Sequence, residues 1–359
     1  MKRLAWILLG ILLAVASLLA LRVRGAPISP AAWRPPPVRS LVRALAVSSE
    51  LADVEVLAPG QVPGPEDVAV DAEGRVYAGT DDGRIVRVTL LPGGEKNVET
   101  FAQTGGRPLG LHFDARGNLL VCDAWKGLLS IDSTGHASTL ATQAEGVPFG
   151  LADDVDIASD GTVYFSDASF KYDLGNTLHD LLEAKPHGRL LRHDPETGRT
   201  DVILDGLYFA NGVALSSNED YVLVVETFRY RITRHWLEGP RAGSSDVFIA
   251  NLPGFPDGVS SNRRGLFWVA LYAPRKPLVD SLHPYPWAKA LLSTLPQALW
   301  PKAEPYGAVL ALDETGVILR TLQDPTGEIL SQTTSAEEHE GFLYLGTLHG
   351  DGVARYRLE

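Results

Sequence analysis

The sequence predicts an all-β protein, a six-bladed β-propeller with an N-terminal transmembrane helix. Three observations lead to this fold class. A hairpin unit recurs six times along the chain, 35 glycines and 24 prolines supply the turns that many short strands need, and one uncharged apolar run lies near the N-terminus. The repeat overrides the usual expectation that a chain of 359 residues forms two domains.

The hairpin unit is clearest at residues 153–167, where Asp160-Gly161 separates two segments of alternating polarity. Asp-Gly is a preferred dipeptide for a tight hairpin turn. Set Asp153 as position zero, and glycine follows eight residues later. The same register holds at the other copies, with Glu219 replacing the glycine in one; their zero positions are Glu66, Leu109, Asn211, Asp257 and Thr333. An apolar segment, the expected second strand, follows each turn. All-β units repeated roughly every 45 residues indicate propeller blades.

The N-terminal run from Leu4 to Leu21 carries no charge. As a helix it would be roughly 27 Å long, enough to span a bilayer. An uncleaved signal anchor in residues 1–24 is favoured, because the apolar run continues past Ala16 and Arg22 and Arg24 follow it. The alternative is a signal peptide cleaved near Ala14-Val15-Ala16. In either case the rest of the chain is expected on the extracytoplasmic side.

Residues 25–50 are rich in proline and predict an extended stalk before the propeller at 51–359. Residues 54–57 predict a strand that belongs to no complete blade. The last copy has only three evident strands, so we expect the early strand to complete it and close the ring.

Two insertions interrupt the repeat, at residues 168–188 in blade three and 272–306 in blade five. A short helix is expected over 177–184 and an amphipathic one over 287–300, although Pro296 would end or kink the latter. A lid, a helix resting on the membrane and a packed decoration of the rim all remain open for these segments.

The zero positions predict a metal site. The first strand of each propeller blade lies along the central axis, so equivalent positions form a ring at one height. Four of the six carry oxygen ligands: Glu66, Asp153, Asn211 and Asp257. Three carboxylates crowded together repel one another unless a cation lies among them. Oxygen ligands without His or Cys favour Ca²⁺. The alternative is that acidic residues at strand starts only cap or solvate the backbone.

Charge and cysteine content narrow the possible partners. The formal charge of −12 argues against nucleic-acid binding and suits a site that attracts a cation. Cys122 is the single cysteine, so no intrachain disulfide forms, and its position in an apolar segment predicts a buried small residue. No obligate protein partner is evident.

The sequence resembles the superfamily of senescence-marker-protein/gluconolactonase and strictosidine synthase-like six-bladed propellers, and within it the adipocyte plasma membrane-associated branch. The resemblance covers about residues 50–359. It rests on six stretches: PGPEDVAVD (63–71), RPLGLHFD (107–114), VYFSDAS (163–169), GLYFANGVALS (206–216), NLPGFPDGVS (251–260) and EHEGFLYLGTLHG (338–350).

The resemblance implies a Ca²⁺ site at Glu66, Asp153, Asn211 and Asp257, the set already found from the register. Asp153 stands where the family often has Asn. Calcium-dependent members hydrolyse lactones, aryl esters or organophosphates, which implies a small ester or lactone substrate. Plant members condense an amine with an aldehyde by means of a glutamate that aligns with Thr334, and the departure argues against that reaction.

The candidate catalytic residues are Asp257 or Asp153 as general base or nucleophile, with His349 as an alternative acid–base group. His112 is a weaker candidate, and His179, His187 and His283 lie in the insertions and are candidates for contact with a substrate. Asp123, Asp167 and Glu226 end second strands and are expected to cap loops, with support of the metal site a further role for Asp167. Two functions remain open: a membrane-anchored Ca²⁺-dependent hydrolase, and a non-enzymatic propeller with a structural ion and a protein- or lipid-binding rim.

Overall fold

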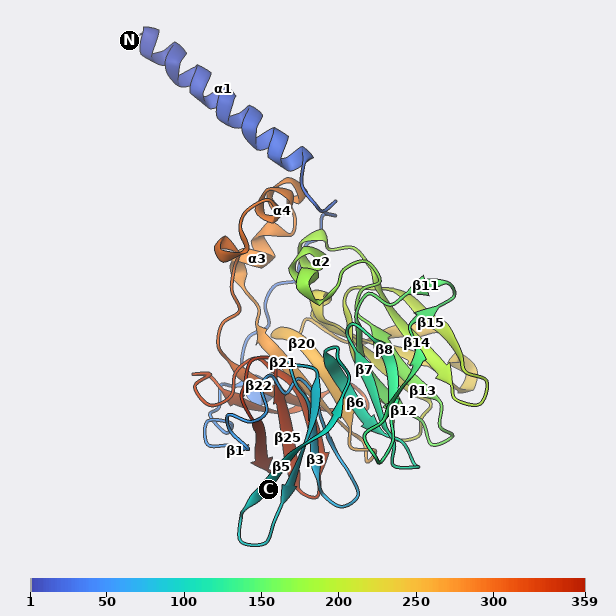
Figure 1. Cartoon of the computed structure of the whole chain (residues 1–359). Helices are drawn as coiled ribbons and strands as arrows, with labels where there is room; N and C mark the ends of the chain where they lie inside the picture. Colours follow the sequence, from blue (N-terminus) through green and yellow to red (C-terminus); the bar gives the residue numbers. More distant parts are fainter. Residues whose placement is uncertain (1, 359) are drawn as a thin grey trace. The chain divides into compact units, whose positions relative to one another are not determined.

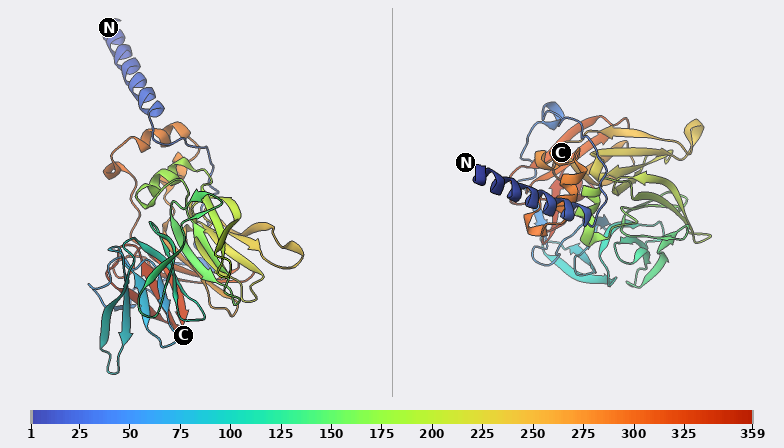
Figure 2. Two further views of the ribbon diagram at one scale, coloured as in Figure 1. Left: turned by 45° about the vertical axis from the view of Figure 1, so that its right-hand side comes forward. Right: turned by 90° about the horizontal axis from the view of Figure 1, so that it is seen from above.

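The computed structural model describes residues 2–358 and confirms the predicted fold class. Six four-stranded antiparallel sheets form the blades of a propeller (Figure 1). The inner strand of each blade contacts the inner strands of both neighbouring blades, in the cyclic order β2, β6, β12, β16, β20 and β24. The six inner strands therefore surround a central channel, and the view from above shows the blades arranged around it (Figure 2).

The strands of each blade follow one another in the chain. Blade one contains β2 (Val68–Val70), β3 (Val76–Gly79), β4 (Arg84–Leu90) and β5 (Lys96–Gln103). Blade two contains β6 (Pro108–Phe113), β7 (Leu119–Asp123), β8 (Gly127–Ile131) and β9 (Ala137–Ala141). Blade three contains β12 (Ala152–Ile157), β13 (Val163–Asp167), β14 (Gly188–Asp194) and β15 (Arg199–Leu207). A small hairpin of β10 (Gln143–Ala144) and β11 (Val147–Pro148) precedes blade three.

Blade four contains β16 (Ala210–Leu215), β17 (Tyr221–Glu226), β18 (Arg231–Trp236) and β19 (Ser245–Ala250). Blade five contains β20 (Gly254–Ser261), β21 (Leu266–Pro274), β22 (Gly307–Asp313) and β23 (Ile318–Asp324). Blade six contains β24 (Thr333–His339), β25 (Phe342–Thr347), β26 (Val353–Arg357) and β1 (Glu55–Leu57).

The ring closes as predicted, through a strand from near the start of the chain. β1 pairs with β26, with Val56 opposite Ala354, and supplies the outer strand of blade six. The pairing holds the first and last strands of the propeller in one blade. The ring of blades is therefore closed.

Apolar clusters between adjacent blades form the core. The largest lies between blades four and five, where Leu223, Phe267 and Leu310 are buried. Cys122 is buried in the cluster between blades two and three, as predicted, and burial raises the pKa of its thiol. The turns explain the glycine register: Gly161 has φ of +90°, and Glu219, which replaces glycine in blade four, adopts φ of +59°.

A second compact unit comprises residues 1–36, 176–185 and 276–302. It contains α1 (Lys2–Arg24), α2 (Thr177–Glu183), α3 (Pro277–Leu282) and α4 (Pro286–Ser293). α1 is long and apolar enough to cross a membrane. α2 agrees with the helix expected over 177–184. The helix expected over 287–300 ends instead at Ser293, and a short 3-10 helix (Gln297–Leu299) follows Pro296.

The proline-rich segment contributes to both units. In the helical unit the backbone N–H groups of Ala31 and Trp33 donate to the carbonyls of Glu183 and His283, at 2.9 and 3.1 Å. In the propeller, Leu45 of the 3-10 helix Arg43–Leu45 is buried, and the backbone N–H of Ser48 donates to the Gln323 side chain at 3.3 Å. Most of this segment has no regular secondary structure, yet these contacts hold it against folded elements.

Candidate functional site

The zero positions of the register meet at one end of the channel. Glu66, Asp153, Asn211 and Asp257 come from four different blades, and all four side chains are buried. In blades three, four and five a register shift between the first two strands, a β-bulge or similar irregularity, falls at or beside position zero. Such a bulge re-aims the side chain that it carries. Here it turns the polar groups at position zero towards the axis.

Glycine beside position zero lets the inner strands converge. A Cβ atom added to Gly258 would lie 2.5 Å from the carbonyl oxygen of Thr334 in blade six, and one added to Gly110 would lie 2.6 Å from Cα of Asp154 in blade three. These distances are shorter than any tolerated contact, so only glycine fits at these two positions. The close approach of the strands narrows the ring and brings its side chains together.

The carboxylates of the ring share an unfavourable electrostatic environment. Burial, together with the charges of Asp257 and Asp67, raises the pKa of Glu66 well above its usual range, although Arg107 opposes this shift. Burial and the charges of Glu66 and Asp257 do the same for the pKa of Asp153. Burial raises the pKa of Asp257 to about 7 despite a hydrogen bond donated by the Asn211 amide. The ring therefore holds more buried negative charge than its protein neighbours compensate.

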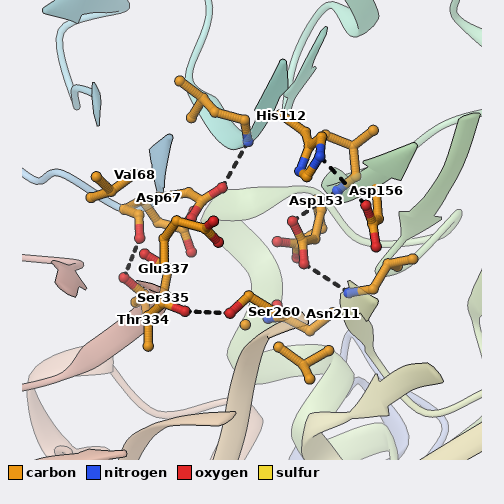
Figure 3. A pocket seen from close by; sticks show the side chains of 18 of the residues that line it. Asp67, Val68, His112, Asp153, Asp156, Asn211, Ser260, Thr334, Ser335 and Glu337 are labelled. Atoms are coloured by element: carbon orange, nitrogen blue, oxygen red, sulfur yellow. Dashed lines mark hydrogen bonds and ion pairs between the residues drawn. The ribbon is translucent and has the colours of Figure 1, made fainter. Parts of the chain in front are cut away.

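The channel interior beside these side chains is small, and polar residues such as Asp153, Asp156 and Glu337 line it (Figure 3). The cavity has a free volume of about 40 Å³, and Glu66, Asp153 and Asn211 are among its lining residues. A water molecule needs about 10–15 Å³ by this measure, so the cavity has room for a few waters or an ion. An organic substrate does not fit at this depth and would have to be held outside the ring.

The donor set fits a hard cation. Carboxylate and amide oxygens are the ligands that Ca²⁺ prefers. Thr333, at position zero of blade six, adds a buried Oγ1 atom for which no hydrogen-bond partner is found among the described residues. Within residues 2–358, however, no three His, Cys, Asp or Glu side chains form a ready-made metal cluster. Asn211 also directs its Nδ2, not its oxygen, at Asp257.

A second row of carboxylates, which the sequence reasoning missed, lies one step along the strands. Asp67 accepts a hydrogen bond from the backbone N–H of Leu111 in blade two, and Asp154 accepts one from that of Val213 in blade four, both at 2.7 Å. These carboxylates join adjacent blades. The signal for them was present, because each directly follows a position-zero acid in the pairs Glu66-Asp67 and Asp153-Asp154.

At the other end of the channel, near the turns between the first and second strands, the buried carboxylate of Asp156 has charged and backbone hydrogen-bond donors. Asp156 accepts hydrogen bonds from the Arg263 guanidinium at 2.6 Å and from the backbone N–H of Leu215 at 2.7 Å. His112 Nε2 lies 3.6 Å from Asp156 Oδ1. Its side chain is 38 % accessible because it faces the channel, while the surrounding protein lowers its pKa through desolvation. A neutral His112 beside the Arg263–Asp156 pair fits a structural role.

The strand-end carboxylates cap loops, as predicted. Asp123 Oδ1 accepts from the backbone N–H of Arg107 at 3.0 Å, and Asp167 Oδ1 from that of Leu151 at 3.0 Å. Arg189 also donates to Asp167, and Arg231 to Glu226. None of the three lines the cavity at the ring.

The predicted histidines lie outside the cavity, apart from His112. His349 is exposed, two residues beyond β25, in a loop whose Gly350 carbonyl accepts from the backbone N–H of Gly64 at 2.7 Å. It is thus at the end of blade six next to Glu66. His179 and His283 pack edge-to-face on Trp300 and Trp33 in the helical unit, and His187 packs on Phe170. The catalytic role of His349 stays a prediction.

Thr334, which aligns with the condensing glutamate of the plant enzymes, is buried. Its hydroxyl donates to the backbone carbonyl of Glu66 at 2.5 Å and so joins blade six to blade one. The position is occupied by a structural contact, which agrees with the expectation from the sequence.

Known proteins match this architecture over nearly its whole length. The strictosidine synthase family model matches residues 153–240, and that of the N-terminal region of strictosidine synthase-like proteins matches residues 44–88. The adipocyte plasma membrane-associated protein of Bos taurus is 35% identical over 382 residues, covering 99% of this chain and 91% of its own. The chain belongs to the strictosidine synthase-like family.

Another family member, the strictosidine synthase-like protein 13 of Arabidopsis thaliana, is 38% identical over 325 residues, or 82% of this chain and 78% of that protein. Among solved structures, a gluconolactonase of Xanthomonas campestris has a TM-score of 0.62 at 19% identity, covering 93% of this chain and 98% of that one. A calcium-binding regucalcin of Agrobacterium tumefaciens has a TM-score of 0.57 at 16% identity, with coverages of 87% and 94%. At such identities the likeness shows the shared propeller fold.

Proposed function

We propose that this family member is a membrane-anchored, Ca²⁺-dependent hydrolase of esters or lactones. The observation that carries the proposal is the ring itself: three buried carboxylates and an amide from four blades converge, and their charge is not compensated by the protein. Gluconolactonase and calcium-binding regucalcin among the structural neighbours are consistent with this chemistry.

Glu66, Asp153, Asn211 and Asp257 would hold the ion. When bound, Ca²⁺ polarises a carbonyl oxygen and stabilises negative charge that develops on it. The chain's own groups supply the rest. Asp257, or Asp153, takes the proton of the attacking water, and Asn211 fixes Asp257 through its amide hydrogen bond. The narrow cavity limits water at the ring to a few molecules.

The membrane anchor in this proposal is α1, with the propeller on the extracytoplasmic side. α1 is long and apolar enough to span, and the family members named adipocyte plasma membrane-associated proteins are consistent with an anchor. Protease protection of the full chain in sealed vesicles checks the side: propeller fragments released from intact cytoplasmic-side-out vesicles would contradict it.

The test is hydrolysis of phenyl acetate and a panel of lactones by the full chain in detergent, with and without EDTA. We expect turnover that EDTA removes and Ca²⁺ restores, at a temperature where a melting curve shows the protein still folded. Asp257→Ala is expected to behave like EDTA. No turnover on any substrate, with EDTA lowering only the melting temperature, would contradict the proposal.

That last outcome would favour the alternative function, a propeller with a structural ion and a binding rim. The small cavity is the observation on its side, because it leaves little room for an organic substrate beside an ion. A strictosidine-type condensation is disfavoured by the buried, hydrogen-bonded Thr334.

A further inference from the structure

α4 of the helical unit has its polarity reversed for a helix of a water-soluble surface. The side packed against the protein carries Lys289 and Ser293, which are 0% and 6% exposed. Lys289 Nζ donates to the carbonyl of Ala31 at 2.6 Å, and Ser293 Oγ to that of Ala290 at 2.7 Å. Surface helices normally bury an apolar stripe and present polar residues to water.

The outward side of α4 is apolar. At 100° per residue, Trp287 and Leu291 lie opposite Lys289 and Ser293, and Ala288 and Leu292 flank this apolar side. Trp287 is 61% exposed, and Ala288, Leu291 and Leu292 are all partly exposed.

Further large side chains of the same unit are exposed next to α4 in the sequence. Tyr285 is 54% exposed at its start, Leu278 is 55% exposed on α3, and Leu299 is 66% exposed after it. Several large exposed apolar side chains on one small folded unit indicate a surface that binds a partner.

The partner is indicated by α1. α4 contacts α1 within this unit, and Figure 1 shows it beside the Arg24 end of the helix. Arg22 and Arg24 at that end mark the level of the lipid headgroups if α1 spans the bilayer. Trp and Tyr concentrate at that level, because their rings are apolar and their N–H or O–H groups remain wet.

We propose that the outward face of α4, with Tyr285, Trp287 and Leu299, docks on the bilayer surface beside α1. This inference rests on the proposed anchoring by α1. The helix would lie in the plane of the interface with its apolar face about 5–10 Å deep, at the boundary of headgroups and acyl chains. The helical unit then has two membrane contacts, a span and a surface helix.

The test uses the full chain in liposomes, with an environment-sensitive fluorophore on single cysteines in a Cys122→Ala background. Cys122 is fully buried, so its removal leaves the surface unchanged. Labels are placed by Trp287→Cys and, as a second site, Leu299→Cys. Val317→Cys is the matched control, because Val317 is 54% exposed in the turn between β22 and β23 of the propeller. Leu12→Cys, on α1, reports the anchor.

We expect the labels at 287 and 299 to emit at shorter wavelength than the label at 317. Lipids that carry a quencher near the headgroup should quench them, whereas aqueous iodide should quench only the label at 317. The label at 12 should respond to quenchers deep in the bilayer. Melting curves of the labelled variants confirm that each is folded.

Three results would overturn the proposal, and they differ from one another. If iodide reaches 287 and 299 as freely as 317 while the label at 12 lies deep, α4 does not dock and only the anchor stands. If 287 and 299 are shielded from both iodide and lipid quenchers, protein covers the face, for example a second copy. If the label at 12 is not quenched by lipid, the anchoring itself fails and docking falls with it.

Discussion

Asp156 at the turn end of the propeller channel and the ring carboxylates at the other end lie in opposite environments. At the turn end, Asp156 is matched by the Arg263 guanidinium and by a backbone N–H of the next blade. At the other end, Glu66, Asp153 and Asp257 face one another, and burial and mutual repulsion raise the pKa values of Glu66 and Asp153. All four side chains are nearly inaccessible, at 4–8% exposure.

The difference separates a structural charge from a functional one. A buried carboxylate that the protein pairs with a guanidinium and with N–H donors has its charge compensated internally, so it requires no ion from solution. Carboxylates that the protein gathers without satisfying cost stability, and they persist where a ligand will compensate them. The contrast therefore supports a cation at the ring more strongly than the number of acidic residues does.

The largest expected effect comes from the same substitution at the two ends. Asp257→Asn should lower the rate of ester or lactone hydrolysis by about 10²–10³-fold. The substitution removes a charged ligand of the ion that would stabilise negative charge on the substrate. It should also remove the rise in melting temperature on adding Ca²⁺. Asp156→Asn is the control, since Asp156 and Asp257 are 4% and 7% exposed. Equal losses of activity in the two variants would break the comparison.

The next effect is on stability at the turn end. Arg263→Met should lower the free energy of unfolding by about 1.5–3 kcal/mol, because it leaves the buried Asp156 without its charged hydrogen-bond donor. The neighbouring Arg264→Met is the control: the Arg264 side chain is 72% exposed, so water screens its pair with Glu338, which contributes about 1 kcal/mol at most. Denaturant unfolding of both variants measures the difference. Equal losses of unfolding free energy in the two variants would show that the Arg263–Asp156 pair stabilises the protein no more than the pair formed by Arg264.

A third prediction concerns pH. The carboxyls of Asp257, Glu66 and Asp153 have pKa values in the folded protein above the unfolded ones, that of Asp257 at about 7. At these three groups the folded protein binds more protons than the unfolded chain, so their contribution to stability is greatest at low pH and is lost as pH rises through the folded pKa values.

In EDTA, the melting temperature of the protein should therefore decrease as pH is raised from about 5 to about 8. Added Ca²⁺ should restore the melting temperature most strongly at the higher pH. Asp257→Asn should flatten the dependence, because it removes one of the titrating groups. A melting temperature that rises over this range in EDTA, with no response to Ca²⁺, would show that the ring is already compensated.

The smallest effect is expected at His349. Because this side chain is exposed and does not line the cavity, His349→Gln should change the free energy of unfolding by less than about 0.5 kcal/mol. We expect kcat to remain close to that of the unmodified protein, since the ring supplies the base. A large loss of kcat with KM unchanged would assign the acid–base role to His349 instead.

The sequence was sufficient to predict the features that depend on local pattern. The eight-residue spacing from position zero to glycine located all six hairpins, because a left-handed turn residue is needed at each. The surplus strand at 54–57 predicted the pairing that closes blade six. The register also predicted that Glu66, Asp153, Asn211 and Asp257 lie together.

Features that depend on contacts between distant segments were not predictable. Arg263 lies in a turn of blade five, and nothing in its neighbourhood indicates that it reaches Asp156 in blade three. The fold of residues 25–36 against α2 and α3 likewise depends on backbone contacts across long sequence separations, such as that of Ala31 with Glu183. The proline-rich composition of that segment shows only that it is extended.

The pairing of Val56 with Ala354 has a consequence for biosynthesis. This pairing of β1 with β26 joins segments from opposite ends of the chain, so it cannot form until the ribosome has released the final strand. Until then the nascent chain carries five blades as an open arc, held at one side by whatever fixes its N-terminus. Such late, long-range pairing is slow and leaves strand edges available to chaperones and proteases. A chain that stops short of β26 cannot pair β1 and cannot close the propeller, so closure of the ring requires complete translation.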